Sequence, residues 1–419
     1  MAIIVLKFGG TSVGSIELVK NAARKIAAFY RQGHKVITIV SAMGHSTDQL
    51  VALARKITRS PHQRELDMLL TAGERISMAL LSIALHDLGV PAMSFTGSQV
   101  GIITDERHSD ARILEIKGDR IRQALRQGKV PIIAGFQGVS QGREITTLGR
   151  GGSDTTAVAC AVAFKARQCR IYTDVDGVYT EDPRVFHNAR LVRKITYDEM
   201  LELATRGAQV LHPRACAIAA RCNMPVQVLS SFSGRPGTTI TKGEKMEKPL
   251  VRAITHDTRL VMAILESVPR NPRVLSQIIT ELAHSGVHLR FFFHGISEAD
   301  RFDLSFILPL EDQAQGFAVL KKIAGRLAAK RLRMKKGIGA VTLVGPGIGS
   351  SLEILTKLLD ILSQARVHIE AVTTSSISVT CFVERRKLFP AIRRLLAGYN
   401  LKRKAAPDGQ RLNRKRRQS

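Results

Sequence analysis

Short apolar runs alternate with longer stretches of helical apolar spacing through the first 245 residues of the chain. The runs predict strands, and apolar positions three to four residues apart predict helices between them. The predicted strands are Ile3–Leu6, Lys35–Val40, Ala92–Phe95, Val130–Ala134 and Cys169–Thr173, with helices at Ile16–Arg31 and Arg64–Leu88. Parallel strands need crossovers, so the pattern predicts an α/β domain in which helices sandwich a mainly parallel sheet. Ligands of such sheets bind at the carboxyl ends of the strands.

The pattern changes after Gly243, where two β-α-β-β-α units of the ferredoxin-like βαββαβ type follow one another. The first has strands Leu260–Leu265, Val287–Phe293 and Phe302–Leu308 with helices Pro272–His284 and Gln315–Ala329; the second has strands from Ala340, Val367–Val372 and Ile377–Val383 with helices Leu352–Ala365 and Leu388–Leu396. His288 and His368 occupy matching places, and we expect both to be strand residues and not ligands. The expected domains are 1–245, 254–335 and 336–403, followed by a basic tail at 404–419 that we expect to be disordered.

Two glycine-rich segments carry most of the candidate chemistry. KFGGTSVG, Lys7–Gly14, directly follows the first strand, and TLGRGGSDTT, Thr147–Thr156, precedes an apolar helical run. Glycines let the backbone approach a ligand closely, and a helix N-terminus favours an anion. Arg150 adds a planar fork suited to a carboxylate or phosphate. Because these loops and the loop after Val40 begin at strand carboxyl ends, we expect them to converge on one cleft.

Two acidic segments leave alternatives open. Glu74, inside an otherwise apolar helix, is either a solvated charge or a fixed anion for a substrate ammonium group. The stretch Tyr172–Arg184, YTDVDGVYTEDPR, holds three aspartates that could bind a metal ion. It lacks the spacing and the terminal glutamate of an EF-hand loop, so a structural turn is the simpler interpretation.

The formal net charge of +28 is concentrated in two basic runs, at Lys321–Lys336 and after Leu401. Neither run carries the interleaved aromatic residues of a platform for single-stranded nucleic acid, and no recognition-helix signature appears. We therefore expect solvated surfaces that steer charged ligands, and no nucleic-acid partner.

Five cysteines are scattered without a close pair at metal-binding spacing: Cys160, Cys169, Cys216, Cys222 and Cys381. No signal peptide is recognisable, and the longest apolar helical run, around Ile76–Leu85, is shorter than the roughly 18 residues that a membrane span requires. We expect reduced thiols, a cytoplasmic location and no membrane partner.

Taken in order, the motifs resemble those of the aspartate kinases of the amino acid kinase superfamily. They are KFGGTSVG from Lys7, SAMG from Ser41, TAGERIS from Thr71, SFTGSQ from Ser94, AGFQGV from Ala134, LGRGGSDTTAVA from Leu148 and YTDVDGVYTEDPR from Tyr172. The two repeats resemble the paired ACT regulatory domains of that family. The resemblance implies transfer of the ATP γ-phosphoryl group to the β-carboxylate of L-aspartate. The product would be 4-phospho-L-aspartate, at the first step of lysine, threonine, methionine and isoleucine biosynthesis.

The resemblance also implies roles for individual residues. In the catalytic step, Lys7 would reach the transferring phosphate, Asp154 would orient Lys7, and Arg150 would grip a carboxylate. The implied substrate-binding residues are Ser41, Thr47, Glu74, Arg150, Gly151, Gly152 and Ser153, and the implied nucleotide-binding residues are Lys7, Gly9, Gly10, Ser12, Thr173, Asp174, Tyr179, Asp182, Arg184 and Gln209. ATP and Mg²⁺ would be the cofactors, with Mg²⁺ bridging phosphate oxygens and no separate protein metal site. Because the acceptor carboxylate is already ionised at neutral pH, positioning and charge neutralisation should dominate over general-base catalysis.

Departures from the family pattern predict altered behaviour. Many relatives carry a lysine where this chain has Gln209, and we expect the nearby Arg206 to compensate for the missing charge. In the first repeat, Arg290 stands where the family commonly has an aspartate that binds an effector ammonium group. In the second repeat, the segment Thr373–Ser378 is close to the family pattern but one residue short. We therefore expect weakened or redirected feedback inhibition through degenerate ACT repeats, although an amino-acid effector there stays open.

Three functional hypotheses follow. The first is an active monofunctional aspartate kinase that forms at least a homodimer, since the chain stops at Ser419 without room for a fused dehydrogenase. The second is a regulatory or binding protein that kept the fold and lost turnover. The retained charges of Lys7, Glu74, Arg150 and Asp154 argue against the second hypothesis. The third is a sibling kinase acting on glutamate, acetylglutamate or uridylate, which the appended repeats and TAGERIS disfavour.

Overall fold

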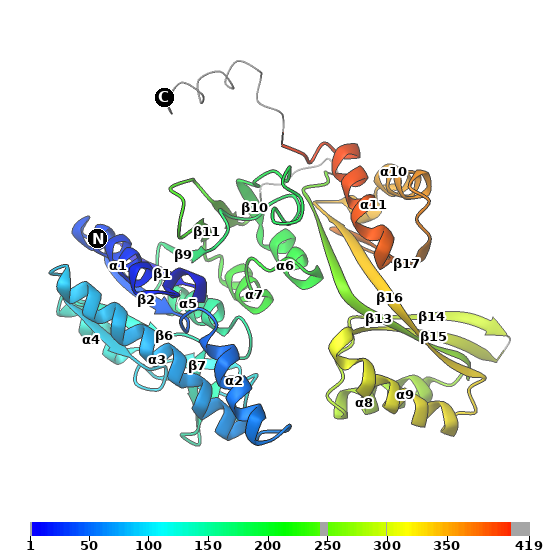
Figure 1. Cartoon of the computed structure of the whole chain (residues 1–419), viewed down its shortest axis with the longest axis horizontal. Coiled ribbons are helices and arrows are strands. Elements are labelled where there is room, and N and C mark those ends of the chain that lie inside the picture. Colours follow the sequence, from blue (N-terminus) through cyan, green and yellow to red (C-terminus); the bar gives the residue numbers. More distant parts are fainter. Residues whose placement is uncertain (1, 244–249, 299, 404–419) are drawn as a thin grey trace, which may run out of the picture. The chain divides into compact units, whose positions relative to one another are not determined.

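The computed structural model describes residues 2–243, 250–298 and 300–403, which fall into two compact units (Figure 1). The first unit takes in Met1–Thr180 and Arg190–Met246, and the second takes in Glu181–Ala189 and Glu247–Ser419. A nine-residue excursion of the first part of the chain, Glu181–Ala189, therefore belongs with the second unit. The expected basic tail at 404–419 lies outside the described residues.

An eight-stranded, mainly parallel sheet forms the centre of the first unit, which confirms the predicted fold class. The strands from β11 to β3 run parallel to one another, whereas β12 is antiparallel to its neighbour β11. In spatial order the strands are β10 (Lys194–Thr196), β12 (Thr238–Thr241), β11 (Val226–Ser230), β9 (Gln168–Thr173), β1 (Ile3–Phe8), β2 (Lys35–Val40), β6 (Val130–Ala134) and β3 (Ala92–Phe95).

Helices cover the two faces of this sheet, and the pleat of β1 decides which residues meet them. Ile4, Leu6 and Phe8 are buried in one apolar core with α1 (Ile16–Arg31) and α3 (Gln63–Asp87). Because side chains alternate along a strand, Lys7 points to the opposite face. That face is covered by α5 (Gly152–Ala163), which contacts β1, β2 and β9.

The remaining elements of the first unit lie around this sandwich (Figure 1). They are the helices α2 (Ser46–Ile57), α4 (Asp119–Arg126), α6 (Tyr197–Arg206) and α7 (Pro213–Cys222), the 3-10 helix Gly10–Val13, and a small sheet in the order β5 (Ile113–Ile116), β4 (Ile102–Thr104), β7 (Gln137–Ser140) and β8 (Ile145–Thr147). The strand β8 ends at Thr147, directly before the second glycine-rich loop.

Helix α3 spans 25 residues, Gln63–Asp87, close to the predicted Arg64–Leu88, and its apolar stretch is longer than the run Ile76–Leu85 from which we judged it too short for a membrane span. Of the described helices, it alone is long and apolar enough to cross a membrane. However, it buries the polar side chains of Asp67, Thr71 and Glu74 inside the first unit. These buried groups are typical of a core helix that also carries functional side chains.

In the part that the structure describes, the second unit contains a six-stranded antiparallel sheet with four α-helices. In spatial order the strands are β14 (Phe291–Glu298), β15 (Arg301–Pro309), β13 (Ala253–Pro269), β16 (Arg331–Val344), β18 (Ser378–Glu384) and β17 (Ile369–Ser375); the helices are α8 (Pro272–His284), α9 (Gln313–Arg326), α10 (Leu352–Gln364) and α11 (Arg385–Gly398). Helix α8 packs on α9, and α10 packs on α11.

The two repeats share their central strands. The amino-terminal part of β13 pairs with the carboxyl-terminal part of β16, with Ala253 opposite Val344, and the pairing continues to Glu266 opposite Arg331. Each repeat therefore has a four-stranded ferredoxin-like sheet whose fourth strand is part of a strand that it shares with the other repeat. The ferredoxin-like character predicted for the repeats is confirmed.

The expectation that His288 and His368 lie in strands was wrong. Both residues precede their strands, because β14 begins only at Phe291 and β17 only at Ile369. The His288 ring nitrogen Nδ1 lies 2.9 Å from Asp312 Oδ2, and its backbone N–H donates to the same oxygen at 2.7 Å. The His288 side chain thus closes a loop through Asp312, and the residue is not part of a β-ladder.

Ion pairs engage part of the basic run Lys321–Lys336. Arg326 pairs with Glu281, Arg333 Nε lies 2.5 Å from Glu266 Oε1, and Lys335 Nζ lies 2.6 Å from Glu370 Oε1. These cations are held by local acidic partners, which fits the expectation of a solvated surface.

Candidate active site

Lys7 and Asp154 form a buried ion pair at the carboxyl end of the central strand β1. Lys7 Nζ lies 2.6 Å from Asp154 Oδ1, and each residue is only 8% exposed. Asp154 sits in the first turn of α5, where a helix N-terminus stabilises a negative charge. Its other oxygen accepts the backbone N–H of His212 at 3.3 Å. The ammonium group is therefore fixed in direction before any substrate is bound.

The first glycine-rich loop is bonded to the end of strand β9 and to the loop that follows β2. The Gly9 N–H donates to Tyr172 O at 3.1 Å, and the Gly44 N–H donates to Gly10 O at 3.0 Å. A Cβ atom at Gly10 would lie 2.9 Å from Ala42 O, so only glycine permits this approach. Ser12 Oγ donates to Tyr172 O at 3.2 Å. The loops after β1 and β2 and the carboxyl end of β9 thus meet at one edge of the sheet.

Glu74 is buried against the loop after β2, so it is not the solvated charge that the sequence left open. The residue is 3% exposed, and its Oε1 accepts the Ala42 N–H at 3.1 Å. Gly73 permits the contact, because a Cβ atom there would lie 2.8 Å from Ala42 Cβ. Among the described residues, Oε2 has no hydrogen-bond partner. Such an oxygen is available to a donor supplied by a ligand.

Burial raises the pKa of Glu74 to about 7, against the opposing effect of its hydrogen bonds from the backbone N–H groups of Glu74 and Ala42. A bound cation would favour the ionised form and lower this pKa again. The carboxylate is therefore electrostatically suited to an ammonium group.

The second glycine-rich loop presents Arg150 to solvent. Arg150 lies between Gly149 and Gly151, which have left-handed φ angles of 75° and 71°. Its side chain is 97% exposed, and its contact with Asp48 is long, with Nη2 3.8 Å from Oδ1. An exposed guanidinium four residues before Asp154 is free to meet an incoming anion near the buried ion pair.

The other predicted acceptor residues surround these groups. Gly152 begins α5, and the buried Ser153 packs so closely on Gly135 that a Cβ atom at Gly135 would lie 2.8 Å from Ser153 Oγ. Ser41 follows β2 and donates its N–H to Phe8 O at 3.1 Å. Thr47 lies in the first turn of α2. These residues all belong to loops or helix starts at the carboxyl edge of the sheet.

The predicted nucleotide-binding residues are divided between the two units. Thr173 ends β9 and donates through Oγ1 to Asp174 Oδ1 at 3.1 Å, and Tyr179 follows in the first unit. Asp182 and Arg184 belong to the excursion that is part of the second unit, where Arg184 Nη2 lies 3.0 Å from Asp182 Oδ2. That ion pair lowers the pKa of Asp182, whose partial burial acts in the opposite direction.

Gln209 is exposed in the segment between α6 and α7, but Arg206 is already engaged. Arg206 Nε donates to Glu202 Oε1 at 2.8 Å, one helical turn earlier. A guanidinium paired in this way offers less positive charge to a phosphate. The contact therefore argues against the expectation that Arg206 replaces the missing lysine.

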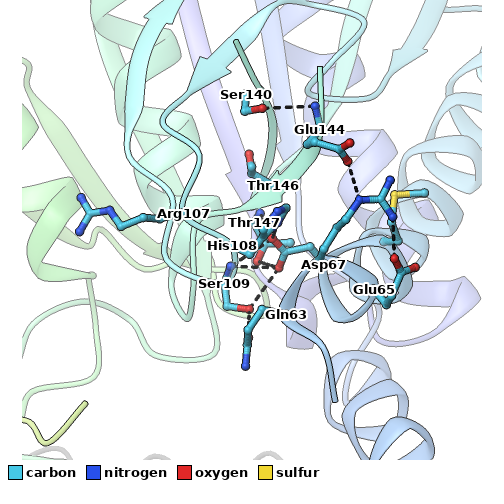
Figure 2. A network of polar contacts seen from close by, with 12 residues as sticks. Gln63, Glu65, Asp67, Arg107, His108, Ser109, Ser140, Glu144, Thr146 and Thr147 are labelled. Atoms are coloured by element: carbon cyan, nitrogen blue, oxygen red, sulfur yellow. Dashed lines mark hydrogen bonds and ion pairs between the residues drawn. The ribbon is translucent and has the colours of Figure 1, made fainter. Parts of the chain in front are cut away.

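Sequence reasoning missed Asp67, which lies on the same face of α3 as Glu74, seven residues earlier. Asp67 is completely buried and is surrounded by donors from residues 108, 109 and 147 (Figure 2). The signal was present, since an aspartate two helical turns from Glu74 breaks the apolar face in the same way. Arg214 was also missed; its Nη1 donates to Leu148 O at 2.8 Å at the base of the Arg150 loop.

Comparison with known proteins agrees with this arrangement. The sequence profile of the amino acid kinase family matches residues 2–230. The aspartokinase of Pseudomonas aeruginosa is 41% identical over 404 residues, which cover 96% of this chain and 98% of the relative. Aspartokinase 2 of Bacillus subtilis is 42% identical over 402 residues, with 96% and 98% coverage.

The fold agrees as well. The crystal structure of E. coli aspartokinase III in complex with aspartate and ADP superposes with a TM-score of 0.81 at 25% identity, covering 94% of this chain and 99% of that one. The fold of the aspartate kinase from Clostridium acetobutylicum is also similar, with a TM-score of 0.74 at 21% identity and coverage of 95% and 100%. This chain therefore belongs to the amino acid kinase family and, within it, to the aspartokinases, the kinases that phosphorylate aspartate.

Proposed function

We propose that this enzyme transfers the γ-phosphoryl group of ATP to the β-carboxylate of L-aspartate through the residues gathered at the carboxyl edge of the eight-stranded sheet. The observation that carries the proposal is the buried pair of Lys7 and Asp154, which holds a cation where the loops after β1 and β2 meet the carboxyl end of β9. Phosphoryl transfer between two anions depends on positioning and charge neutralisation, and a fixed ammonium group supplies both.

On the nucleotide side, Lys7 contacts the transferring phosphate, and Gly9, Gly10 and Ser12 form the backbone beneath the phosphates. The close approach that Gly10 permits to Ala42 O supports this role, because no side chain intervenes there. By resemblance to the family, Thr173, Asp174, Tyr179, Asp182, Arg184 and Gln209 are the remaining nucleotide-binding residues that we propose. E. coli aspartokinase III, which superposes on this chain, was crystallised with ADP.

Mg²⁺ is carried by the nucleotide phosphates in this proposal. Among the described residues, no group of three or more His, Cys, Asp or Glu side chains could hold a metal ion. Mg²⁺ keeps several waters and binds through substrate phosphates with one or two carboxylates, so the donor set here fits it. Asp174, exposed after β9, is a carboxylate that could complete such a shell. When bound, the ion neutralises charge on the phosphate oxygens.

On the acceptor side, Glu74 receives the α-ammonium group of aspartate, and Arg150 grips a carboxylate. The buried Oε2 without a partner among the described residues supports the first role. The exposed guanidinium between two glycines supports the second. Ser41 and Thr47 donate hydrogen bonds, and Gly151, Gly152 and Ser153 shape the loop. No general base is needed, because the attacking carboxylate is ionised at neutral pH.

The test measures ADP release by the purified full-length chain with and without L-aspartate, in the presence of ATP and Mg²⁺. We expect release that depends on aspartate and is not supported by glutamate, acetylglutamate or uridylate. The variant Lys7→Met should lower its rate by about 10²–10³-fold, whereas Lys20→Met, which changes an exposed lysine on α1, should leave it unchanged. Absence of ADP release would instead favour the binding-protein hypothesis, and release that does not depend on aspartate would contradict aspartate as the acceptor.

We also propose weakened or redirected feedback regulation. Arg290 is exposed at the position where the family commonly has an aspartate, and a cation there repels an effector ammonium group. In the second repeat, Ser375 Oγ lies 2.8 Å from Ser378 Oγ and accepts the Ile377 N–H at 3.3 Å, so the turn uses its polar groups internally. By contrast, E. coli aspartokinase III was crystallised with lysine and aspartate in a T-state.

Steady-state rates with millimolar lysine, threonine or both decide this regulatory proposal. Rates that change little support it, and strong inhibition by either amino acid contradicts it.

The domains that we propose are a catalytic domain at 1–245 and ACT-like repeats at 254–335 and 336–403. We further propose a cytoplasmic location and a homodimer or higher homo-oligomer. Light scattering on the full-length chain as it elutes from a size-exclusion column would test the oligomeric state.

A further inference from the structure

The buried carboxylate of Asp67 has no part in the chemistry proposed above. Asp67 lies in the second turn of α3 and is 0% exposed. Glu74 follows seven residues later, which is about two helical turns or roughly 10 Å along the helix axis, on the same face. One helix therefore holds the proposed ammonium-binding group and a second buried acid at a fixed separation.

Four donors converge on Asp67, and all come from two distant segments (Figure 2). Asp67 Oδ1 accepts the Thr147 hydroxyl at 2.6 Å, and Oδ2 accepts the Thr147 N–H at 3.1 Å. The Ser109 N–H lies 3.1 and 3.0 Å from the two oxygens. The Ser109 hydroxyl donates to Gln63 Oε1 at 2.5 Å and lies 3.3 Å from Asp67 Oδ1. His108 Nδ1 lies 2.9 Å from Oδ2. Hydrogen bonds to a charged acceptor are roughly twice as strong as neutral ones.

Part of the backbone held by Asp67 is strained. Ser109 has a φ angle of 65°, a left-handed conformation that residues other than glycine rarely adopt. Such a conformation persists only where its surroundings enforce it. The hydrogen bonds that the Ser109 N–H donates to Asp67, and the one that the Ser109 hydroxyl donates to Gln63, can do so.

The two segments held by Asp67 meet at the base of the Arg150 loop. Thr147 is followed directly by Leu148 and Gly149, and a Cβ atom at Gly149 would lie 2.9 Å from Ser109 O. On α7, Arg214 holds the same base: Nη1 donates to Leu148 O at 2.8 Å, and Nη2 donates to Ala111 O at 2.7 Å. The backbone before Arg150 is thus held by two helices, although the Arg150 side chain is itself exposed.

We propose that Asp67 is a positioning residue that directs Arg150 and fixes the distance between the Arg150 loop and Glu74, and so selects the length of the acceptor. This inference rests on the proposed function, in which Glu74 binds the ammonium group and Arg150 a carboxylate. Because α3 is a rigid element that carries both Glu74 and the anchor of the loop, the spacing of the two charges is built into the helix. In an acceptor that is longer by one methylene group, the carboxylate would be displaced from the position in which Arg150 binds it.

The principal test is Asp67→Asn, which keeps the size of the side chain but turns an amide N–H₂ group toward donors. We expect the KM for aspartate to rise at least about tenfold and the KM for ATP to change less than about twofold, with a reduced preference for aspartate over glutamate in kcat/KM. Thr147→Val removes only the shortest bond and should give a smaller shift in the same direction. This second variant keeps the test usable if Asp67→Asn does not fold.

Glu199→Gln is the matched control. Glu199 is a carboxylate with 2% exposure in the capping box of α6, where it bonds to Thr196. Its replacement should lower the melting temperature without changing the KM for aspartate. Arg150→Ala completes the set, because a residue that acts through Arg150 should add little further KM increase when Arg150 is absent.

Three results would overturn the positioning role: an unchanged KM for aspartate in Asp67→Asn, an equal rise in Glu199→Gln, or full additivity with Arg150→Ala. Calorimetric titration of the same full-length proteins with aspartate separates this inference from the proposed function. Binding that is equally tight in wild type and Asp67→Asn overturns the positioning role. Binding by wild type that is weakened in Asp67→Asn, without aspartate-dependent turnover, supports the positioning role and overturns only the proposed reaction.

Discussion

Lys7 Nζ lies 2.6 Å from Asp154 Oδ1, and neither group has more than about a tenth of its side chain exposed. The two residues are 147 positions apart in the chain and meet because the β1 pleat turns Lys7 toward α5. Removing charges from water is costly, so a buried ion pair adds little net stability. Its effect on a ligand is the better explanation for this pair. A phosphate that approaches Lys7 meets an ammonium group whose direction is already set.

The first prediction separates stability from catalysis at this pair. Asp154→Asn leaves Lys7 buried without its anion, so we expect the free energy of unfolding to fall by about 3–5 kcal/mol. The variant Lys7→Met should lower kcat by about 10²–10³-fold, because it removes charge that stabilises the transition state. The double variant Lys7→Met with Asp154→Leu should recover most of the stability and none of the activity. Denaturant unfolding and ADP release measure the two effects; a double variant less stable than both single variants would contradict the argument.

The second prediction concerns the pH dependence of aspartate binding. With the pKa of Glu74 raised to about 7 by burial, the free enzyme loses the negative charge at this site as the pH falls below about 7. We therefore expect kcat/KM for aspartate to decline toward acid with an apparent pKa near 7, because this parameter reports groups of the free enzyme. In Glu74→Gln the parameter should be low and without this inflection. An unchanged inflection in that variant would assign the titration to another group.

Glu74 also affects how stability depends on pH, and the direction of this effect is opposite to that of an ordinary salt-bridged acid. The folded-state pKa of Glu74 lies above its ordinary value of 4.5, so the folded state loses stability as the pH rises through about 7. The shift corresponds to a cost on the order of 3 kcal/mol for the ionised group. Glu74→Gln should therefore be more stable than wild type at pH 8, and this difference should shrink below pH 5. Thermal unfolding at the two pH values provides the measurement.

The placement of the charged groups was predictable where they follow a strand. Lys7 and Arg150 lie in glycine-rich segments with local signatures, and parallel strands bring their carboxyl ends to one edge. Asp67 had no comparable signature, because its donors lie 41 to 80 residues away and only the folded chain brings them together. The pairing of Arg206 with Glu202 could have been anticipated, since residues four apart on a helix are neighbours.

The repeats show a second limit of pattern reasoning. The apolar residues Val287 and Leu289 predicted a strand, but the described strand β14 begins only at Phe291. Apolar alternation reports burial, whereas membership in a ladder also requires a partner strand in register. The sharing of β13 and β16 between the repeats was not predicted for the same reason, because a pairing such as that of Ala253 with Val344 has no local signature in the sequence.

The third prediction uses the contact between α3 and the loop after β2. Glycine inside a helix ordinarily destabilises by about 1 kcal/mol relative to alanine. Gly73→Ala should nevertheless destabilise, by about 1–3 kcal/mol, because the new Cβ atom would lie 2.8 Å from Ala42 Cβ. It should also raise the KM for aspartate by moving Glu74 from the Ala42 N–H. The control is Gly325→Ala in α9, where nothing lies within 4 Å of the added atom and stabilisation is expected. Equal effects at both glycines would refute the packing argument.

In the second unit, a buried acid is paired with a histidine. Glu181 is 4% exposed, and its Oε1 lies 2.9 Å from His256 Nδ1. The His256 ring meets Phe186 and Phe389 edge-on, with ring centroids 6.1 and 5.3 Å apart. Glu181 and Phe186 come from the excursion Glu181–Ala189, so this cluster fastens that segment to the second unit.

The fourth prediction is that the second unit loses stability as the pH rises from 6 to 8. Burial raises the pKa of Glu181. Burial lowers the pKa of His256, but its hydrogen bond to Glu181 and the negative charges of Glu181, Asp182 and Asp257 together raise this pKa above its ordinary value. A group whose folded-state pKa is raised contributes its stability below the unfolded pKa and loses it through the folded one, so both groups act in the same direction. His256→Gln should be less stable than wild type at pH 6, with a smaller difference at pH 8. His284→Gln, an exposed histidine at the end of α8, is the control and should track wild type. If calorimetry shows parallel pH profiles for wild type and His256→Gln, the pair is not the origin of the dependence.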